Sequence, residues 1–230
     1  MSATLSAPIR LRLLAAAAGF GLLGACASTT APLSGSQATN DPYEVQNRKT
    51  FAVNQKLTSQ GSGGGVASVI PEPFQDLIHN VSENLSMPQV AVNSLLQGDL
   101  RGTGLALHRF SVNSVLGMGG LVDAASEFGV PEHDTDFGET LHVWGVGEGA
   151  FVMLPILGAS TQRDVAGRVV DLFTDPLSYR LPEPERYVGT GIGLADGVIQ
   201  GSRRAKPATY EAARAEYLER RRADVSSRRR

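Results

Sequence analysis

The chain has 230 residues, 42% of them hydrophobic, and a formal net charge of −2 at pH 7. This length and composition predict one folded unit with enough apolar side chains to bury a core. The near-neutral charge excludes the broad basic surface with which nucleic-acid-binding proteins attract phosphate, so we expect no nucleic-acid partner.

Residues 1–25 have the layout of a lipoprotein signal peptide. Arg10 and Arg12 supply positive charge before an apolar run over 13–25. That run would reach only about 20 Å as a helix, against the roughly 30 Å hydrocarbon core of a bilayer, so it is a poor membrane span. Leu23-Gly24-Ala25-Cys26 has the shape of a bacterial lipobox, whose cysteine is acylated after cleavage. The alternative is an ordinary signal peptide with a cysteine near its cleavage site.

Cys26 is the predicted lipid-attachment residue. It is the only cysteine of the chain, so no intramolecular disulfide can form. Acyl chains contribute about 0.8 kcal/mol per buried CH₂, and two or more of them make the attachment lasting. Ala27 and Ser28 follow Cys26 in place of an inner-membrane-retaining Asp, which favours the outer membrane. Residues 26–40 are rich in Ser, Thr, Ala, Gly and Pro, and they predict a flexible tether.

Residues 41–224 predict a single, compact and mainly helical domain. Apolar side chains recur at helical spacing from Pro73, and Pro88 suits the first turn of a second helix that ends at Gly98. Asp99 can cap a third helix over residues 100–116, which is apolar nearly all round. Such a helix lies either in a core or against lipid, and in a chain of this size we favour the core.

The second half of the domain alternates turns with shorter elements. Gly117 to Gly120 form a turn before a short helix over 121–128, and apolar runs at 141–146 and 151–157 predict short strands or a buried loop. A capping-box-like start at 161–164 precedes a helix that ends at Asp175-Pro176. The last helix covers residues 208–223, with its arginines in water, and residues 225–230 form a disordered tail.

Motifs for catalysis are incomplete, and we expect neither enzymatic activity nor a cofactor or metal. Residues 158–162 come nearest to a hydrolase nucleophile elbow but lack its final glycine, so Ser160 is better explained as a helix-start residue. His133, Asp134 and Asp136 could ligate a metal, but a solvated loop is the better explanation because no second ligand cluster follows. Arg109 predicts a structural ion pair with an acidic residue.

The order of several motifs between Asp41 and Ala223 resembles the VacJ/MlaA lipoprotein family. The segments that carry the resemblance are Asp41-Pro42-Tyr43-Glu44, Asn47-Arg48, Phe51-Ala52-Val53-Asn54, Pro71-Glu72-Pro73-Phe74, the stretch 80–88, Val92-Asn93-Ser94-Leu95-Leu96-Gln97-Gly98, the stretch 109–125, Asp136-Phe137-Gly138-Glu139-Thr140-Leu141, the stretch 144–149, Leu154-Pro155, the stretch 160–164, and Tyr210, Arg214, Tyr217 and Arg220 in the last helix. The sequence departs from the family between Leu57 and Ile70, where a glycine run replaces a longer segment.

The resemblance implies a ring-like helical lipoprotein in the inner leaflet of the outer membrane, on its periplasmic side. Proteins of this family lie beside trimeric porins and pass phospholipid from the outer leaflet, through an amphipathic channel, to a soluble periplasmic carrier. By the same resemblance, six residues are expected to line the channel or face the membrane: Phe110, Leu116, Met118, Leu121, Trp144 and Phe151. Two alternatives stay open, a structural lipoprotein that braces porins without transport and, more remotely, a lipid hydrolase.

Overall fold

The computed structural model describes residues 40–59, 70–177, 185–203 and 207–227. These residues are mainly helical, with one two-stranded sheet among them, as the sequence predicts. The elements in chain order are α2 (Glu44–Ser59), α3 (Glu72–Leu96), α4 (Leu100–Val115), α5 (Ala124–Glu127), α6 (Phe137–Val143), β1 (Phe151–Leu154), β2 (Gly158–Thr161), α7 (Gln162–Thr174), α9 (Glu185–Arg203) and α10 (Tyr210–Ser227).

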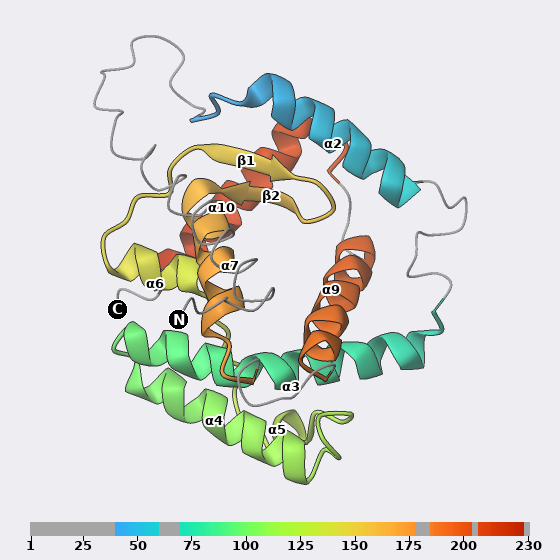
Figure 1. The fold of residues 1–230 in the computed structure, drawn as a ribbon, viewed down its shortest axis with the longest axis vertical. Coiled ribbons are helices and arrows are strands. Elements are labelled where there is room, and N and C mark those ends of the chain that lie inside the picture. Colours follow the sequence, from blue (N-terminus) through green and yellow to red (C-terminus); the bar gives the residue numbers. More distant parts are fainter. Residues whose placement is uncertain (1–39, 60–69, 178–184, 204–206, 228–230) are drawn as a thin grey trace, which may run out of the picture.

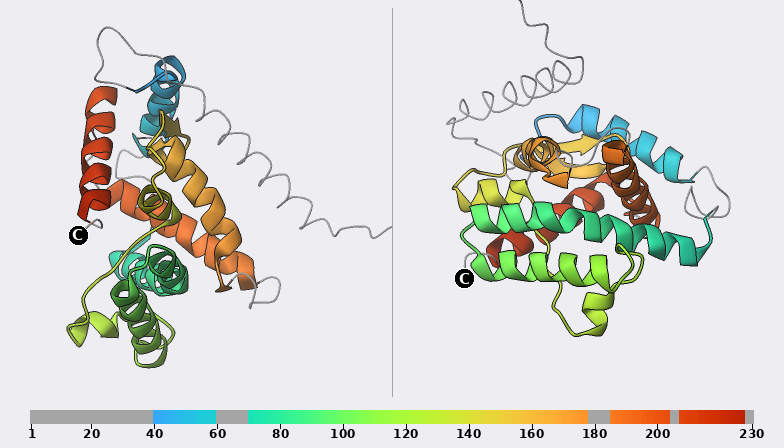
Figure 2. Two further views of the ribbon diagram at one scale, coloured as in Figure 1. Left: turned by 90° about the vertical axis from the view of Figure 1, so that its left-hand side faces the viewer. Right: turned by 60° about the horizontal axis from the view of Figure 1, so that its bottom comes forward.

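In the view of Figure 1, most of the described helices and the β-hairpin are arranged around the centre of the molecule. Helix α3 forms one side, α9 and α7 rise from it, and α2 with the β-hairpin lies across the opposite side. Helix α4 lies along the outer side of α3, as the further views in Figure 2 also show. The arrangement agrees with the ring-like shape that the family resemblance implies.

Helix α3 is continuous through Pro88, so the predicted break into two helices is wrong. A proline inside a helix removes one backbone hydrogen bond and crowds the preceding turn. Burial on both sides of the proline offsets that cost, because Met87, Val90 and Ala91 pack together against Ala106 of α4. Tertiary packing therefore outweighs the local preference of Pro88 to begin a helix.

Helix α4 begins where the sequence predicts. Its N-cap residue Asp99 accepts a 2.8 Å hydrogen bond from the backbone N–H of Gly102, and the helix ends one residue before the predicted end. The prediction that this helix lies in the core is wrong for the face of α4 that points away from α3. Leu100, Leu107 and Val115 are exposed there, while Ala106 is buried against α3.

Of the two apolar runs at 141–146 and 151–157, for which two short strands or a buried loop were open, only the second contains a strand. Leu141 to Val143 belong to α6, which Asp136 caps by accepting a 2.8 Å bond from the backbone N–H of Glu139. Strand β1 pairs antiparallel with β2, and the register places Phe151 opposite Thr161. A short apolar run fits a helix and a strand equally well, so only the cap at Asp136 could have distinguished them.

The apolar core between the hairpin and α10 contains Phe151, Met153, Tyr210, Ala213 and Tyr217. Helix α10 extends to Ser227, and Val225 on it is buried. The predicted tail is thus wrong for residues 225–227, whereas 228–230 lie outside the described residues. The signal peptide, Cys26, residues 27–39 of the tether and the glycine run within 60–69 also lie outside them, whereas Asn40 at the end of the tether is hydrogen-bonded to Gly149 and Phe151.

Candidate functional site

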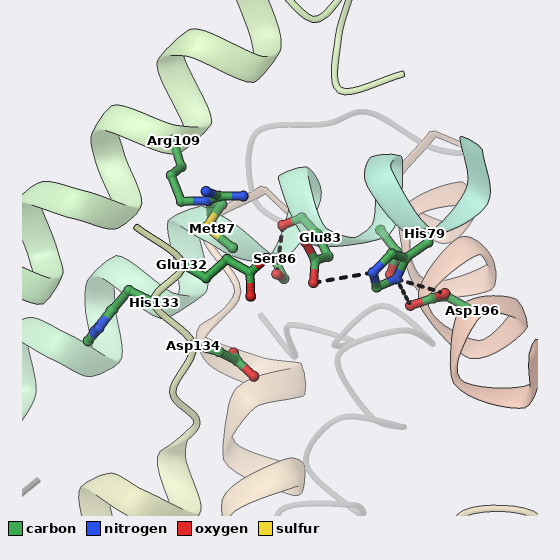
Figure 3. A pocket seen from close by; sticks show the side chains of 10 residues that line it. His79, Glu83, Ser86, Met87, Arg109, Glu132, His133, Asp134 and Asp196 are labelled. Carbon is green, nitrogen blue, oxygen red and sulfur yellow. Dashed lines mark hydrogen bonds and ion pairs between the residues drawn. The ribbon is translucent and has the colours of Figure 1, made fainter. Parts of the chain in front are cut away.

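A polar pocket of about 220 Å³ opens between α3, α9 and the segment before α6 (Figure 3). We call it the α3–α9 pocket. Its lining residues are His79, Ser82, Glu83, Ser86 and Met87 from α3, Arg109 from α4, Glu132, His133 and Asp134 from the segment before α6, and Asp196 from α9. Apart from Arg109 and His133 with Asp134, none of these was singled out from the sequence. No local pattern marks them, because the fold brings together residues more than a hundred positions apart.

His79 connects the two helices of the pocket. Its Nδ1 lies 3.2 Å from an Asp196 carboxylate oxygen, and its Nε2 lies 3.5 Å from Oε1 of Glu83 one turn further along α3. Figure 3 shows the imidazole between these two carboxylates. The contact holds α9 against α3 at the pocket.

Arg109 forms the structural ion pair that the sequence predicts. Its side chain is 2% exposed, and Nη2 donates to both carboxylate oxygens of Asp123 at 3.0 and 2.9 Å. Nη1 donates to the carbonyl oxygen of Val130 at 2.9 Å. Desolvation alone would raise the pKa of Asp123, but hydrogen bonds from Ser126 and Asn113 and the charge of Arg109 lower it. The pair fixes the turn after α4 and the segment that leads to the pocket.

Two glycines of the predicted turn, Gly117 and Gly120, allow close packing. A Cβ atom on Gly117 would lie 2.1 Å from the carbonyl oxygen of Val122, and one on Gly120 would lie 2.6 Å from Cβ of Asn84. Gly120 also has a φ of 95°, and Met118 between them has a φ of 53°. A side chain at Gly120 would displace the turn from α3, and one at Gly117 would clash with the backbone of the turn itself.

Four of the six residues expected to contact lipid are exposed. The exposed fractions are 59% for Leu116, 68% for Met118, 41% for Leu121 and 54% for Trp144. The first three share the end of α4 and the following turn with other exposed apolar side chains. We call this set the 115–128 surface: Val115, Leu116, Met118, Leu121, Val122 and Phe128. Within the described residues, no helix has the length and apolarity of a membrane span.

The other two expected residues lie elsewhere. Phe110 is half-buried and packs against the α3–α4 core. Phe151 is 1% exposed, with its ring edge-on to those of Tyr210 and Tyr217, so its assignment to a channel or membrane face is wrong. Strand alternation alone cannot tell a core-facing aromatic residue from a lipid-facing one.

Helix α10 is held to the rest of the domain by charged side chains that were predicted to lie in water. Arg221 is 13% exposed, and it donates to Asp136 at 2.6 Å, to Glu139 at 3.0 Å and to Asp164 at 3.1 Å. The prediction of solvated arginines is therefore wrong for Arg221, and also for Arg214, whose side chain is 14% exposed. The partners of Arg221 belong to α6 and α7, so a single guanidinium ties three helices together.

The start of the domain is bound to α10 in the same way. The Asp41 side chain is fully buried and accepts hydrogen bonds from the Tyr210 hydroxyl, from Asn47 at 2.7 Å and from Arg214 at 3.3 Å. Asn47 in turn accepts a 2.8 Å bond from the backbone N–H of Met153 in β1. These polar residues occur in the motifs of the family resemblance, and the structure gives them a role in holding the domain closed.

The remaining candidates have structural surroundings. His133 is hydrogen-bonded to Ser94 at 2.9 Å, and Asp136 caps α6, so the predicted solvated loop is wrong for both residues. Nowhere in the part of the chain that the structure describes do three or more His, Cys, Asp or Glu side chains gather as metal ligands. Ser160 is 0% exposed within β2, and Thr161 is the N-cap of α7, accepting a bond from the backbone N–H of Asp164.

Comparison with known proteins matches the whole domain to one family. The family model described as MlaA lipoprotein matches residues 39–224. The Escherichia coli K12 protein named intermembrane phospholipid transport system lipoprotein MlaA is 36% identical over 178 residues, which cover 74% of this chain and 70% of that protein. The protein of the same name from Haemophilus influenzae is 32% identical, over 57% of this chain and 55% of that protein.

A solved structure has the same fold. It was reported as the structural basis for maintenance of bacterial outer membrane lipid asymmetry, and it matches with a TM-score of 0.60 at 32% sequence identity. The match covers 78% of this chain and 96% of that one.

Proposed function

The chain belongs to the MlaA lipoprotein family, and we propose on that basis that it removes phospholipid from the outer leaflet of the outer membrane and passes it to a soluble periplasmic carrier. The family match over residues 39–224 carries the proposal, because it includes nearly every described element. The names of the relatives place them in intermembrane phospholipid transport.

Attachment to the membrane is proposed to occur through acylated Cys26, with residues 26–40 as the tether. The protein then sits on the periplasmic side of the outer membrane, beside a trimeric porin. The 115–128 surface supports contact with lipid, because six apolar side chains within 14 residues of the sequence are exposed, and exposed apolar surface is costly in water. Trp144 supports it as well, since its indole Nε1 donates to the Leu96 carbonyl oxygen and leaves the ring exposed beside exposed leucines.

Transfer without covalent chemistry is part of the proposal. Ser160, the serine nearest to a hydrolase motif, is 0% exposed and cannot reach a lipid ester. Moving a phospholipid requires polar surface for the headgroup and apolar surface for the acyl chains. The α3–α9 pocket and the 115–128 surface provide surfaces of these two kinds.

The proposal is tested by deleting the gene and measuring phospholipid exposed in the outer leaflet. We expect phospholipid to accumulate there and the cells to become detergent-sensitive, with both effects reversed by the wild-type chain. Unchanged outer-leaflet phospholipid in the deletion strain would contradict transport and favour a bracing role beside porins.

A further inference from the structure

The wall of the α3–α9 pocket is acidic. Four carboxylates line it, contributed by α3, by α9 and by the segment before α6 (Figure 3): Glu83, Glu132, Asp134 and Asp196. The pocket also contains the imidazoles of His79 and His133 and the guanidinium of Arg109. Asp123 holds that guanidinium through both of its oxygens, so Arg109 neutralises a carboxylate outside the pocket. The wall therefore stays net negative even when both imidazoles are protonated.

The size of the pocket suits a headgroup better than an ion or a whole lipid. Its volume is about 220 Å³. A phospholipid with two acyl chains is far larger, so only its polar end fits. Ser82 and Met87 also line the pocket, which gives the wall hydroxyl and apolar atoms beside its charges.

We propose that the α3–α9 pocket receives the ammonium end of a zwitterionic glycerophospholipid, of the phosphatidylethanolamine kind, while the acyl chains stay outside it. This inference rests on the proposed function and adds a headgroup preference to it. The primary ammonium donates three N–H bonds, which the carboxylates of the wall accept. The glycerol headgroup of phosphatidylglycerol has no positively charged N–H donor. Its net negative charge is repelled by the carboxylates of the wall.

Two other cationic ligands fit the pocket less well. Choline has no N–H to donate and is recognised by aromatic cages. Among the described residues that line the pocket, none is Phe, Tyr or Trp. A divalent cation requires several carboxylates converging at short distance, and such a group of ligands is not found in the described part of the chain.

Electrostatic coupling within the wall supports the proposal. Partial burial raises the pKa of Glu83, the charges of His79 and Arg109 oppose the rise, and the charges of Glu132 and Asp134 add to it. The carboxylates thus act on each other across the pocket although they come from different elements. An ammonium group placed between them would relieve this repulsion.

The test measures which lipids the protein retains. The full-length lipoprotein, purified in a nonionic detergent, is incubated with equal amounts of phosphatidylethanolamine, phosphatidylglycerol and phosphatidylcholine that share the same acyl chains. It is then repurified, and the bound lipids are quantified by mass spectrometry. We expect phosphatidylethanolamine to be enriched about fivefold or more over phosphatidylglycerol, the size of effect that one or two partly exposed charge contacts provide.

Charge-removing variants locate the preference. Glu83→Gln with Glu132→Gln is expected to bring the enrichment close to one while total bound lipid persists. Glu127→Gln on α5 removes an exposed carboxylate outside the pocket and should keep the wild-type preference. If the double variant unfolds at a lower temperature than the wild type, the single variant Glu132→Gln is used in its place, because Glu132 is exposed. A smaller loss of the phosphatidylethanolamine preference is then expected.

Three outcomes would overturn the inference. Equal retention of phosphatidylethanolamine and phosphatidylglycerol by the wild type removes the headgroup preference but leaves phospholipid transport intact. A preference that persists in the double variant places the selection outside this pocket. Retention of no phospholipid at all contradicts the proposed function itself.

Discussion

The hydroxyl of Tyr217 donates a 2.6 Å hydrogen bond to Oδ2 of Asp164. Both residues are buried, and Asp164 also accepts from Arg221 and from its chain neighbour Arg163. The bond joins α10 to α7 beside the aromatic core that contains Phe151. It therefore connects the end of the chain to the middle of the domain.

Tyr217→Phe removes this bond while keeping the ring. A buried carboxylate that loses a donor costs about 1–3 kcal/mol, so the free energy of unfolding should fall by that amount in urea titrations. Tyr43→Phe is the matched control, because Tyr43 is 47% exposed and should change stability by less than about 0.5 kcal/mol. Equal stability of Tyr217→Phe and the wild type would show that the bond contributes nothing.

Stability should fall in acid because of Asp164. Desolvation raises the pKa of this carboxyl, but the charges of Arg221 and Arg163 and the bond from Tyr217 outweigh it and lower the pKa. A carboxyl with a lowered folded-state pKa stabilises the fold above its unfolded pKa of about 3.9, and that contribution disappears as the pH falls through the folded value.

Urea titrations between about pH 6 and pH 2 measure this loss. Asp164→Asn should be less stable than the wild type near neutral pH, and its stability should depend less on pH across this range. Asp123→Asn is a second test, since the pKa of Asp123 is lowered as well. The carboxyl of Asp171 gives the stability the opposite dependence on pH, because burial raises its pKa. Parallel pH profiles for the wild type and both variants would refute the assignment.

Cys26→Ser should abolish anchoring. Without the thiol no acyl chain can be attached, and among the described residues no helix has the length and apolarity to span the membrane in its place. We expect the variant to be unprocessed or to leave the outer-membrane fraction, measured by cell fractionation and by the mass of the mature protein. Ser28→Ala, two residues away, should fractionate like the wild type. Normal outer-membrane fractionation of Cys26→Ser would contradict the lipobox.

Two helices with a side-chain cap, α4 and α7, could be predicted from the sequence. Asp99 and Thr161 precede helical apolar spacing, and each accepts a backbone N–H three residues on, so α4 and α7 begin as predicted. Pro88 could not be interpreted locally, since the packing of Met87 and Val90 against α4 decides that α3 continues. Local sequence fixes where elements can start, and tertiary burial decides which of those starts are used.

Residues of the candidate site were harder to predict than the fold. Exposure of Leu116 and Met118 agrees with a lipid-contacting role, whereas Phe151 has the same apolar character and belongs to the core. The α3–α9 pocket went unpredicted because His79 and Asp196 are 117 residues apart and meet only when α9 lies against α3. Such sites need the arrangement of helices in space, which no motif of this chain encodes.

The most direct test of phospholipid transfer is crosslinking with a photoreactive phospholipid whose attachment sites are mapped by mass spectrometry. The intact lipoprotein should carry the label, with modified peptides from the 115–128 surface when the reactive group is on an acyl chain and from α3 near Glu83 when it is on the headgroup. An anchored, folded protein that takes up no label, or one that releases cleaved phospholipid, would contradict transfer.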